Sequence, residues 1–188
     1  MAYPAKTDKS RILAAAMALL ARRGLRGMSL RAVATSLKIA PNALYRYFAD
    51  HAQLEAAVGA DVSRMLHAVL LKAKRADDPE KSIRAMAKAY LKFARENALL
   101  YEALLIRRPA SGDEAVAPRQ LWLFVVEQVG RLCGEAKAPE ASVALWAFLH
   151  GMASLQSAGL LGVEKPATSI DFGLQAWLAA ARALRVAT

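Results

Sequence analysis

The chain has 188 residues, of which 56% are hydrophobic, so it can bury a sizeable core and is unlike a disordered chain. Nine Lys and Arg against two Asp give residues 1–50 a charge of +7, which leaves +3 of the total +10 for the other 138 residues. This basic block favours a polyanion-binding module, although a merely soluble basic face would carry the same charge. The single cysteine excludes an internal disulfide and fits a reducing cytoplasm, and no apolar run reaches the roughly 18 residues of a membrane span.

Helical periodicity runs through the whole chain, and no segment alternates as a half-buried strand does. In the first 50 residues three short helices are expected, over 8–23, 30–37 and 41–48. Gly24 ends the first, Ser29 caps the second, and Pro41 opens the third at a position where its missing N–H costs nothing. Three short helices with a three-residue turn before the last one form a helix-turn-helix.

The remaining residues predict a larger helical domain, over 51–188, after a DNA-binding domain over 1–50. Asp50 and Gln53 have the spacing of a capping box for a long helix. Further helices are expected from Pro79, from Asn97, over 118–137, over 139–158 and from Ser169, with a polar loop at 110–117. The sequence thus predicts an all-α fold of about nine helices.

The segment from Ser29 to Phe48 resembles the signature of the TetR family of transcriptional regulators. The matching positions are the Ser29 cap, Val33-Ala34, Leu44-Tyr45, Tyr47 and Phe48. The resemblance is strong over residues 7–58, and beyond them only the helix count and the stretch from Trp146 to Gly151 are similar. It implies a homodimeric repressor that a small apolar effector releases from a palindromic operator.

The third helix has a natural outward face. At about 100° per residue, Leu44 and Phe48 share a buried side, so Asn42 and Arg46 point away from it. Asn and Arg are the side chains that bond adenine and guanine edges. The residues expected at DNA are Ser29, Arg31, Lys38, Pro41, Asn42, Ala43, Tyr45, Arg46 and Tyr47.

Two positions depart from the family pattern. Lys38 stands where the family usually has glycine, which implies a left-handed backbone at a cost of about 1 kcal/mol or an added phosphate contact. His51 stands where the family often has a phosphate-binding lysine.

The helices after residue 50 carry apolar and aromatic side chains that favour ordinary core packing, whereas the resemblance implies a ligand pocket among them. The candidate pocket residues are Met65, Val69, Tyr90, Phe93, Tyr101, Trp122, Val125 and His150. In the family the last two helices of each subunit form a four-helix bundle. The candidate interface residues are Trp146, Leu149, Ala153, Leu174, Trp177 and Ala181.

No catalytic constellation, metal-ligand spacing or phosphate loop is present in the sequence, so neither an enzyme nor a cofactor is expected. Cys133 lies in an apolar stretch and is expected to be a small buried side chain. The competing hypothesis is a helical module whose basic helices bind an acidic protein or an anionic surface. A preference for one duplex sequence over another at fixed salt would separate the two.

Overall fold

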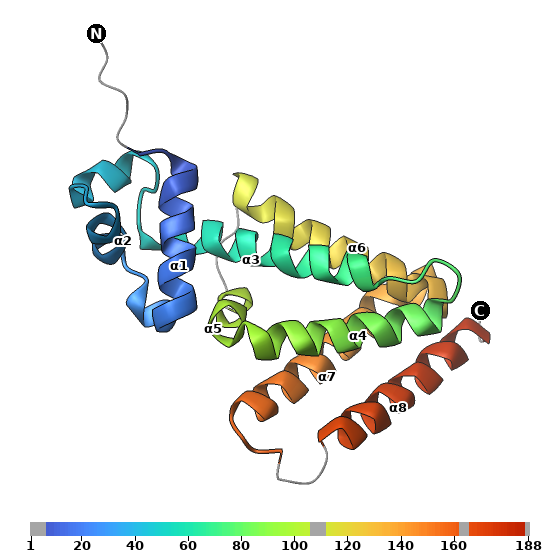
Figure 1. Cartoon of the computed structure of the whole chain (residues 1–188). Coiled ribbons are helices and arrows are strands. Elements are labelled where there is room, and N and C mark those ends of the chain that lie inside the picture. The colour runs from blue at the N-terminus through green and yellow to red at the C-terminus, as the bar shows by residue number, and fades with distance from the viewer. Residues whose placement is uncertain (1–6, 106–111, 162–165, 187–188) are drawn as a thin grey trace. The chain divides into compact units, whose positions relative to one another are not determined.

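The computed structural model describes residues 7–105, 112–161 and 166–186, and all regular structure within these ranges is helical (Figure 1). This confirms the predicted all-α fold. The α-helices are α1 (Lys9–Gly27), α2 (Leu30–Leu37), α3 (His51–Ala73), α4 (Pro79–Glu96), α5 (Ala98–Tyr101), α6 (Val116–Cys133), α7 (Ala138–Ser157) and α8 (Pro166–Val186). Short 3-10 helices occupy η1 (Pro41–Arg46), η2 (Glu102–Leu104), η3 (Gly112–Ala115) and η4 (Glu135–Lys137). No helix in the described ranges is long and apolar enough to cross a membrane.

The contacts divide the chain into two compact units. The first contains residues 1–64 and 97–118, and the second contains residues 65–96 and 119–188. The boundary expected after residue 50 therefore falls inside the first unit. The difference arises because the stretch with α5 and η2 packs against α1, a pairing of distant segments that local periodicity does not report.

The first helix begins where its sequence predicts, but Gly24, which was expected to end it, interrupts it, and α1 continues to Gly27. Asp8 is the N-cap, and its carboxylate accepts the backbone N–H of Arg11 at 2.8 Å. Hydrogen bonds from the Ser10 hydroxyl and from the Arg11 N–H hold the pKa of Asp8 below its usual value. Gly24 interrupts the helix with φ 66°, and a Cβ there would lie 3.4 Å from the Leu99 side chain of α5. Glycine permits the backbone turn, while a Cβ at this position would be at an ordinary contact distance from α5.

A cation at the start of α1 ties two distant parts of the first unit together. The Lys9 ammonium donates to the Glu114 carboxylate of η3 at 3.1 Å and lies 5.6 Å from the centre of the Phe48 ring. The hydrogen bond from Lys9 lowers the pKa of Glu114. The pair therefore links η3 to the start of α1.

The predicted cap of α3 is confirmed with one change. The Asp50 carboxylate accepts the Gln53 N–H at 2.8 Å, as a capping box requires. The reciprocal bond runs from the Ala49 N–H to the Gln53 side chain at 2.6 Å, one residue before the position of an ideal box. The start of α3 is thus fixed on both sides of Asp50.

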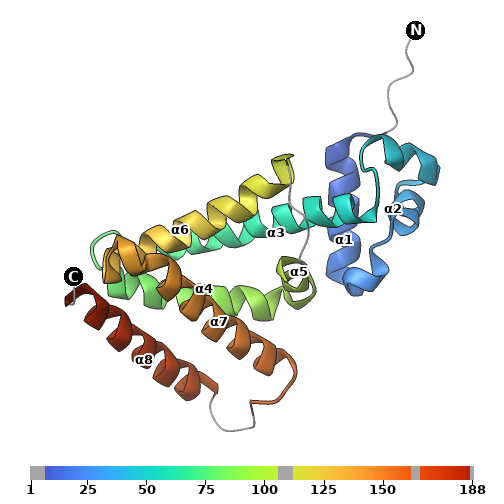
Figure 2. The same cartoon turned by 180° about the vertical axis from the view of Figure 1, so that it is seen from behind.

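In the second unit α7 packs against both α4 and α8 (Figure 2). Three expected boundaries move. The first is the start of α6, which lies at Val116. Within the loop predicted over 110–117, η3 and the first turn of α6 therefore occupy the described part, and residues 110–111 lie outside the described residues. The same helix ends at Cys133, because Gly134 takes φ 87°. Finally, α8 begins at Pro166 and contains Ser169, since proline at a first helical position starts a helix without a capping hydroxyl.

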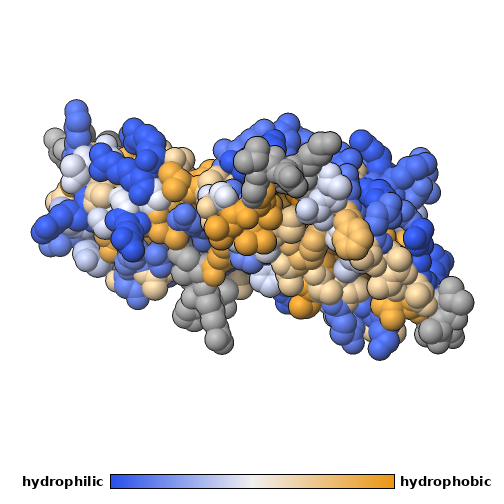
Figure 3. Space-filling view, turned by 90° about the horizontal axis from the view of Figure 1, so that it is seen from below, coloured by the Kyte–Doolittle hydropathy of each residue, from blue (hydrophilic) through white to orange (hydrophobic). Residues whose placement is uncertain are grey.

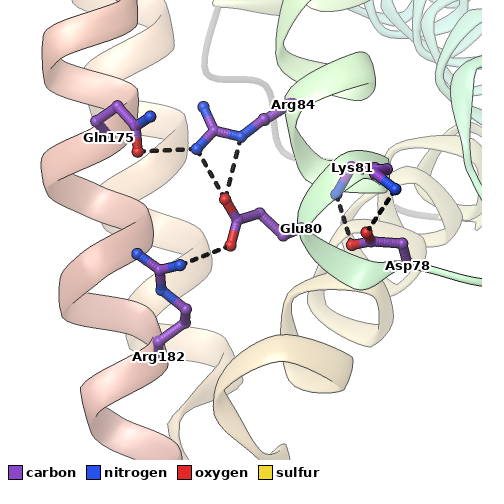
Figure 4. A network of polar contacts seen from close by, with 6 residues as sticks. All are labelled: Asp78, Glu80, Lys81, Arg84, Gln175 and Arg182. Atoms are coloured by element: carbon purple, nitrogen blue, oxygen red, sulfur yellow. Dashed lines mark hydrogen bonds and ion pairs between the residues drawn. The ribbon is translucent and has the colours of Figure 1, made fainter.

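A buried thiol and a polar network complete the second unit. Cys133 is buried, and burial raises the pKa of its thiol, as suits a small core side chain. The carboxylate of Glu80 in α4 accepts a hydrogen bond from the Arg84 guanidinium at 2.8 Å and another from the Arg182 guanidinium of α8 at 2.9 Å (Figure 4). Arg84 also donates to the Gln175 side chain of α8 at 2.8 Å. Two guanidinium groups therefore share one carboxylate, which fixes the position of α8 along α4.

Candidate nucleic-acid interface

The first element of the helix-turn-helix is fixed by its cap and its buried side. The Ser29 hydroxyl oxygen accepts the Ala32 N–H at 3.1 Å, so the predicted cap is present. Leu30, Val33 and Ala34 are buried in the first unit. Arg31 is exposed on the opposite side of α2, as a side chain that contacts a partner must be.

Lys38 ends α2 in the left-handed region, with φ 55° and ψ 42°. Its N–H donates to the Thr35 carbonyl at 3.1 Å, and the Ile39 N–H donates to the Ala34 carbonyl at 3.1 Å. These two bonds are a Schellman motif, whose left-handed position usually holds glycine. The backbone expected from the departure at Lys38 is therefore present, and its side chain is exposed.

The recognition segment η1 is a 3-10 helix rather than the α-helix that was expected. Its anchors are as predicted, since Leu44 and Phe48 are fully buried. The outward face differs, because side chains three residues apart eclipse one another in a 3-10 helix. Asn42 and Tyr45 lie on one line and Ala43 and Arg46 on the next, so Asn42 and Arg46 do not share a line.

The exposed fractions place members of both lines at the surface. Tyr45 is 55% exposed, Pro41, Asn42 and Arg46 are exposed, and Ala43 is half-buried. The N-terminal end of η1 has no side-chain cap from Ala40. All the expected contact residues of this segment thus reach the surface at least in part.

Tyr47 makes a long-range contact that the sequence did not predict. It is half-buried, and its hydroxyl donates to the Thr7 carbonyl at 2.8 Å. A phenol has one proton to donate, so a phosphate oxygen would compete with Thr7 for it. Tyr47 therefore anchors Thr7, two residues before the start of α1, beside the recognition segment.

A cleft of about 270 Å³ lies at the same place. Lys38 and Arg46 supply its two cations, and Ile39, Ala40, Ala43, Thr7 and Tyr47 complete its lining. Thr7 is 7% exposed, and its hydroxyl is buried with no hydrogen-bond partner. Sequence reasoning missed Thr7 as a site residue, since its proximity to η1 depends on a contact across 40 positions.

His51 is also tied to the helix-turn-helix. One ring nitrogen, Nε2, lies 2.6 Å from the Met28 carbonyl, which directly precedes the Ser29 cap, and the other lies 3.7 Å from the Glu55 carboxylate. The ring therefore links the first turn of α3 to the start of α2. The departure of His51 from the family pattern was the sequence feature that could have indicated this linking role.

The candidate pocket residues fall in both units. Tyr101 belongs to the first unit, and the other seven belong to the second. Tyr90, Phe93 and Tyr101 are buried, whereas Val69, Trp122, Val125 and His150 are half-buried. Met65 is 38% exposed, so much of its side chain faces away from the core.

The candidate interface residues also divide. Four of them are buried within the second unit itself, namely Leu149, Ala153, Leu174 and Ala181. Trp177 is half-buried and donates its indole N–H to the Ala141 carbonyl at 3.1 Å. Only Trp146, at 48% exposed, presents a large free surface.

Other side chains supply the apolar surface of α7 and α8. Val143 and Leu155 of α7 and Phe172 of α8 are 50%, 40% and 76% exposed. Figure 3 shows apolar surface in orange and tan over the region of α7 and α8, with hydrophilic groups around it. The amphipathic pattern alone did not separate this outer face from the face that closes the core.

Two family models match the sequence. Residues 12–58 match the model described as bacterial regulatory proteins, tetR family, and residues 83–185 match the tetracyclin repressor-like C-terminal domain. No protein with a curated description matches.

Solved structures share the fold at low sequence identity. A protein of unknown function from Rhodococcus sp. RHA1 has a TM-score of 0.77 and 21% identity over 92% of this chain and 94% of its own. Apo ActR from Streptomyces coelicolor has a TM-score of 0.75 and 17% identity over 98% of both chains. A TetR variant from Acinetobacter baumannii AYE in complex with minocycline has a TM-score of 0.73 and 20% identity over 95% of this chain and 98% of its own.

The match to the C-terminal model alone covers more than half of the sequence, and the match to the N-terminal model coincides with the helix-turn-helix built from α2 and η1. The chain therefore belongs to the TetR family of DNA-binding transcriptional regulators.

Proposed function

We propose that this protein is a cytoplasmic repressor that binds a near-palindromic operator as a homodimer and leaves it when a small apolar effector binds. The observation that carries the proposal is the exposed line of Asn42 and Tyr45 on η1, held over the buried Leu44 and Phe48. An element that is rigid on its inner side and polar on its outer side can enter a major groove with its side chains in place.

Base reading is assigned to exposed polar residues of α2 and η1. Asn42 can bond adenine through two contacts, and Arg31 on α2 can bond a guanine edge or a phosphate. Ser29 lies at the N-terminal end of α2, where backbone N–H groups favour a phosphate. These roles predict separate effects of substitution on sequence preference and on overall affinity.

The dimer is proposed to form through α7 and α8. On α8 the exposed residues Phe172, Ala176, Ala179 and Ala183 follow one another at steps of four, three and four, which places them on one side of the helix. On α7 a Cβ added at Gly151 would meet no atom within 4 Å, so a partner helix has room for close approach. The buried candidate interface residues would then pack beneath this face within each subunit, and Trp146 would contact the partner directly.

An effector can act only if it binds one arrangement of the protein more tightly than another. The helix α3 starts next to the helix-turn-helix at His51 and continues to Ala73, in the second unit. Val69 on α3 and the buried Tyr90 and Phe93 on α4 are the residues proposed to line the pocket of an apolar ligand. A preference of about 100-fold for one position of α3, or about 2.7 kcal/mol, is enough for partial release from the operator.

Selection of bound fragments from random duplex DNA tests the proposal. The selected sites should be near-palindromes with half-sites about one helical turn apart. Asn42→Ala should relax the preference at one base pair per half-site by about 1–3 kcal/mol. If no duplex is enriched, and an acidic protein or anionic vesicle binds as tightly as DNA at the same salt, the competing interaction-module function is the correct one.

A further inference from the structure

We infer that the cleft between Thr7 and the recognition segment is a phosphate-binding site, and that Arg46 belongs to it rather than to the base-reading line. The inference rests on the proposed DNA-binding function and adds a ligand class to one part of its surface. In the complex the occupant is a phosphate of the DNA backbone. A free phosphate group has the same chemistry, and the experiment below separates the two sources.

The backbone at Lys38 is the first argument. Among the described residues Lys38 is the sole residue other than glycine with positive φ. Residues held in sparsely populated backbone regions cluster at functional sites such as ligand clamps. The side chain at this turn is a cation, and it lines the cleft.

The position of Arg46 is the second argument. The eclipsed line of Ala43 and Arg46 faces the cleft, whereas Asn42 and Tyr45 on the neighbouring line are not part of its lining. The small side chain of Ala43 lines the cleft together with Arg46. Two cations therefore border one small cleft, and within the described residues no carboxylate lines it.

Thr7 is the third argument. Its hydroxyl is buried without a hydrogen-bond partner, in a residue that Tyr47 holds in place through the backbone carbonyl. A buried hydroxyl without a partner is unfavourable, and because Thr7 lines the cleft, a shift of its side chain would bring the hydroxyl to a phosphate oxygen that accepts its proton. The cleft thus offers two positive charges and a neutral donor to one anion, which suits a phosphodiester.

The test uses the full chain and two duplexes, the selected operator and a shuffled sequence, over a range of salt concentrations. Arg46→Gln and Lys38→Asn should each weaken both duplexes by the same factor and make the salt slope shallower, by at most about 0.9 per bound subunit, because the two cations share one phosphate. Lys38→Asn keeps a residue that tolerates the left-handed region. Thr7→Val should lower both affinities about tenfold per bound subunit without changing the salt slope.

Three control variants sharpen the result. Arg46→Lys and Thr7→Ser keep the charge and the hydroxyl, so each should bind more tightly than its matched loss variant. Arg22→Gln removes an exposed charge from α1, outside the cleft lining, and should change the slope less than Arg46→Gln does. If Arg46→Gln changes the ratio of the operator affinity to the shuffled-duplex affinity, Arg46 reads bases and the phosphate assignment is overturned. The assignment is also overturned if neither Arg46→Gln nor Thr7→Val changes the affinity for either duplex.

Inorganic phosphate, compared with chloride at equal ionic strength, identifies the source. A rise in thermal stability that Arg46→Gln abolishes, together with the duplex effects, shows that the cleft accepts phosphate in both forms. Duplex effects without that rise restrict it to the DNA backbone. A phosphate effect without any duplex effect overturns the backbone assignment. If the wild-type chain prefers no duplex at all, the proposed function itself fails.

Discussion

Lys38→Gly should make the protein more stable while weakening its binding to DNA. The left-handed backbone at φ 55° costs a residue with a Cβ about 1–2 kcal/mol, and glycine avoids this cost. Glycine also loses more backbone entropy on folding, which offsets about 0.5–1 kcal/mol of the gain. The net increase in the free energy of unfolding should therefore be about 0.5–1 kcal/mol.

Lys38→Ala is the matched control, because it removes the same charge and leaves the backbone strained. Urea unfolding of wild type, Lys38→Gly and Lys38→Ala at one protein concentration gives the three free energies. Operator affinity should fall equally in both variants, and only the glycine variant should gain stability. If the glycine variant is no more stable than the alanine variant, the strain at this turn has been overestimated. If it is stabilised and binds the operator as wild type does, Lys38 makes no contact with DNA.

Tyr47→Phe should lower the free energy of unfolding by about 1 kcal/mol in urea titrations, because the Thr7 carbonyl loses its donor, and should weaken all duplexes alike. Glu80→Gln should lower the midpoint of thermal unfolding, since two guanidinium groups lose their shared negative charge. As a control, Lys81→Gln removes the exposed ion pair with Asp78 and should leave the midpoint unchanged. Glu114→Gln should cost stability at neutral pH and cost nothing in acid, because a lowered pKa gives stability that disappears as pH falls through it. Phe172→Glu should yield helical monomers in sedimentation, as the site is 76% exposed in one chain and would be buried in the dimer.

Local features of the fold were predictable because each depends on residues a few positions apart. The Ser29 and Asp50 caps, the interruption at Gly24 and the left-handed turn at Lys38 all follow from residue type and spacing. The buried anchors Leu44 and Phe48 followed from periodicity in the same way. These positions define where the recognition segment starts, turns and packs.

The features that were missed depend on geometry that periodicity does not contain. Six residues are too few to separate 100° from 120° per residue, so the 3-10 form of η1 and the separation of Asn42 from Arg46 were not predictable. The Tyr47 to Thr7 bond spans 40 positions. An apolar helix face does not reveal which of its residues meet the chain's own core, so the sequence did not show that Leu149 and Leu174, expected at the interface, are buried within the single chain.

The most direct test of the DNA-binding assignment is the affinity of the protein for its selected operator and for a shuffled duplex at one physiological salt concentration, measured by fluorescence anisotropy. The account predicts that the operator binds about 10³-fold or more tightly than the shuffled duplex. It also predicts that Asn42→Ala lowers this ratio while Tyr47→Phe leaves it unchanged. Equal affinity for the two duplexes in the wild-type protein would contradict the account, because a basic surface alone attracts every sequence alike.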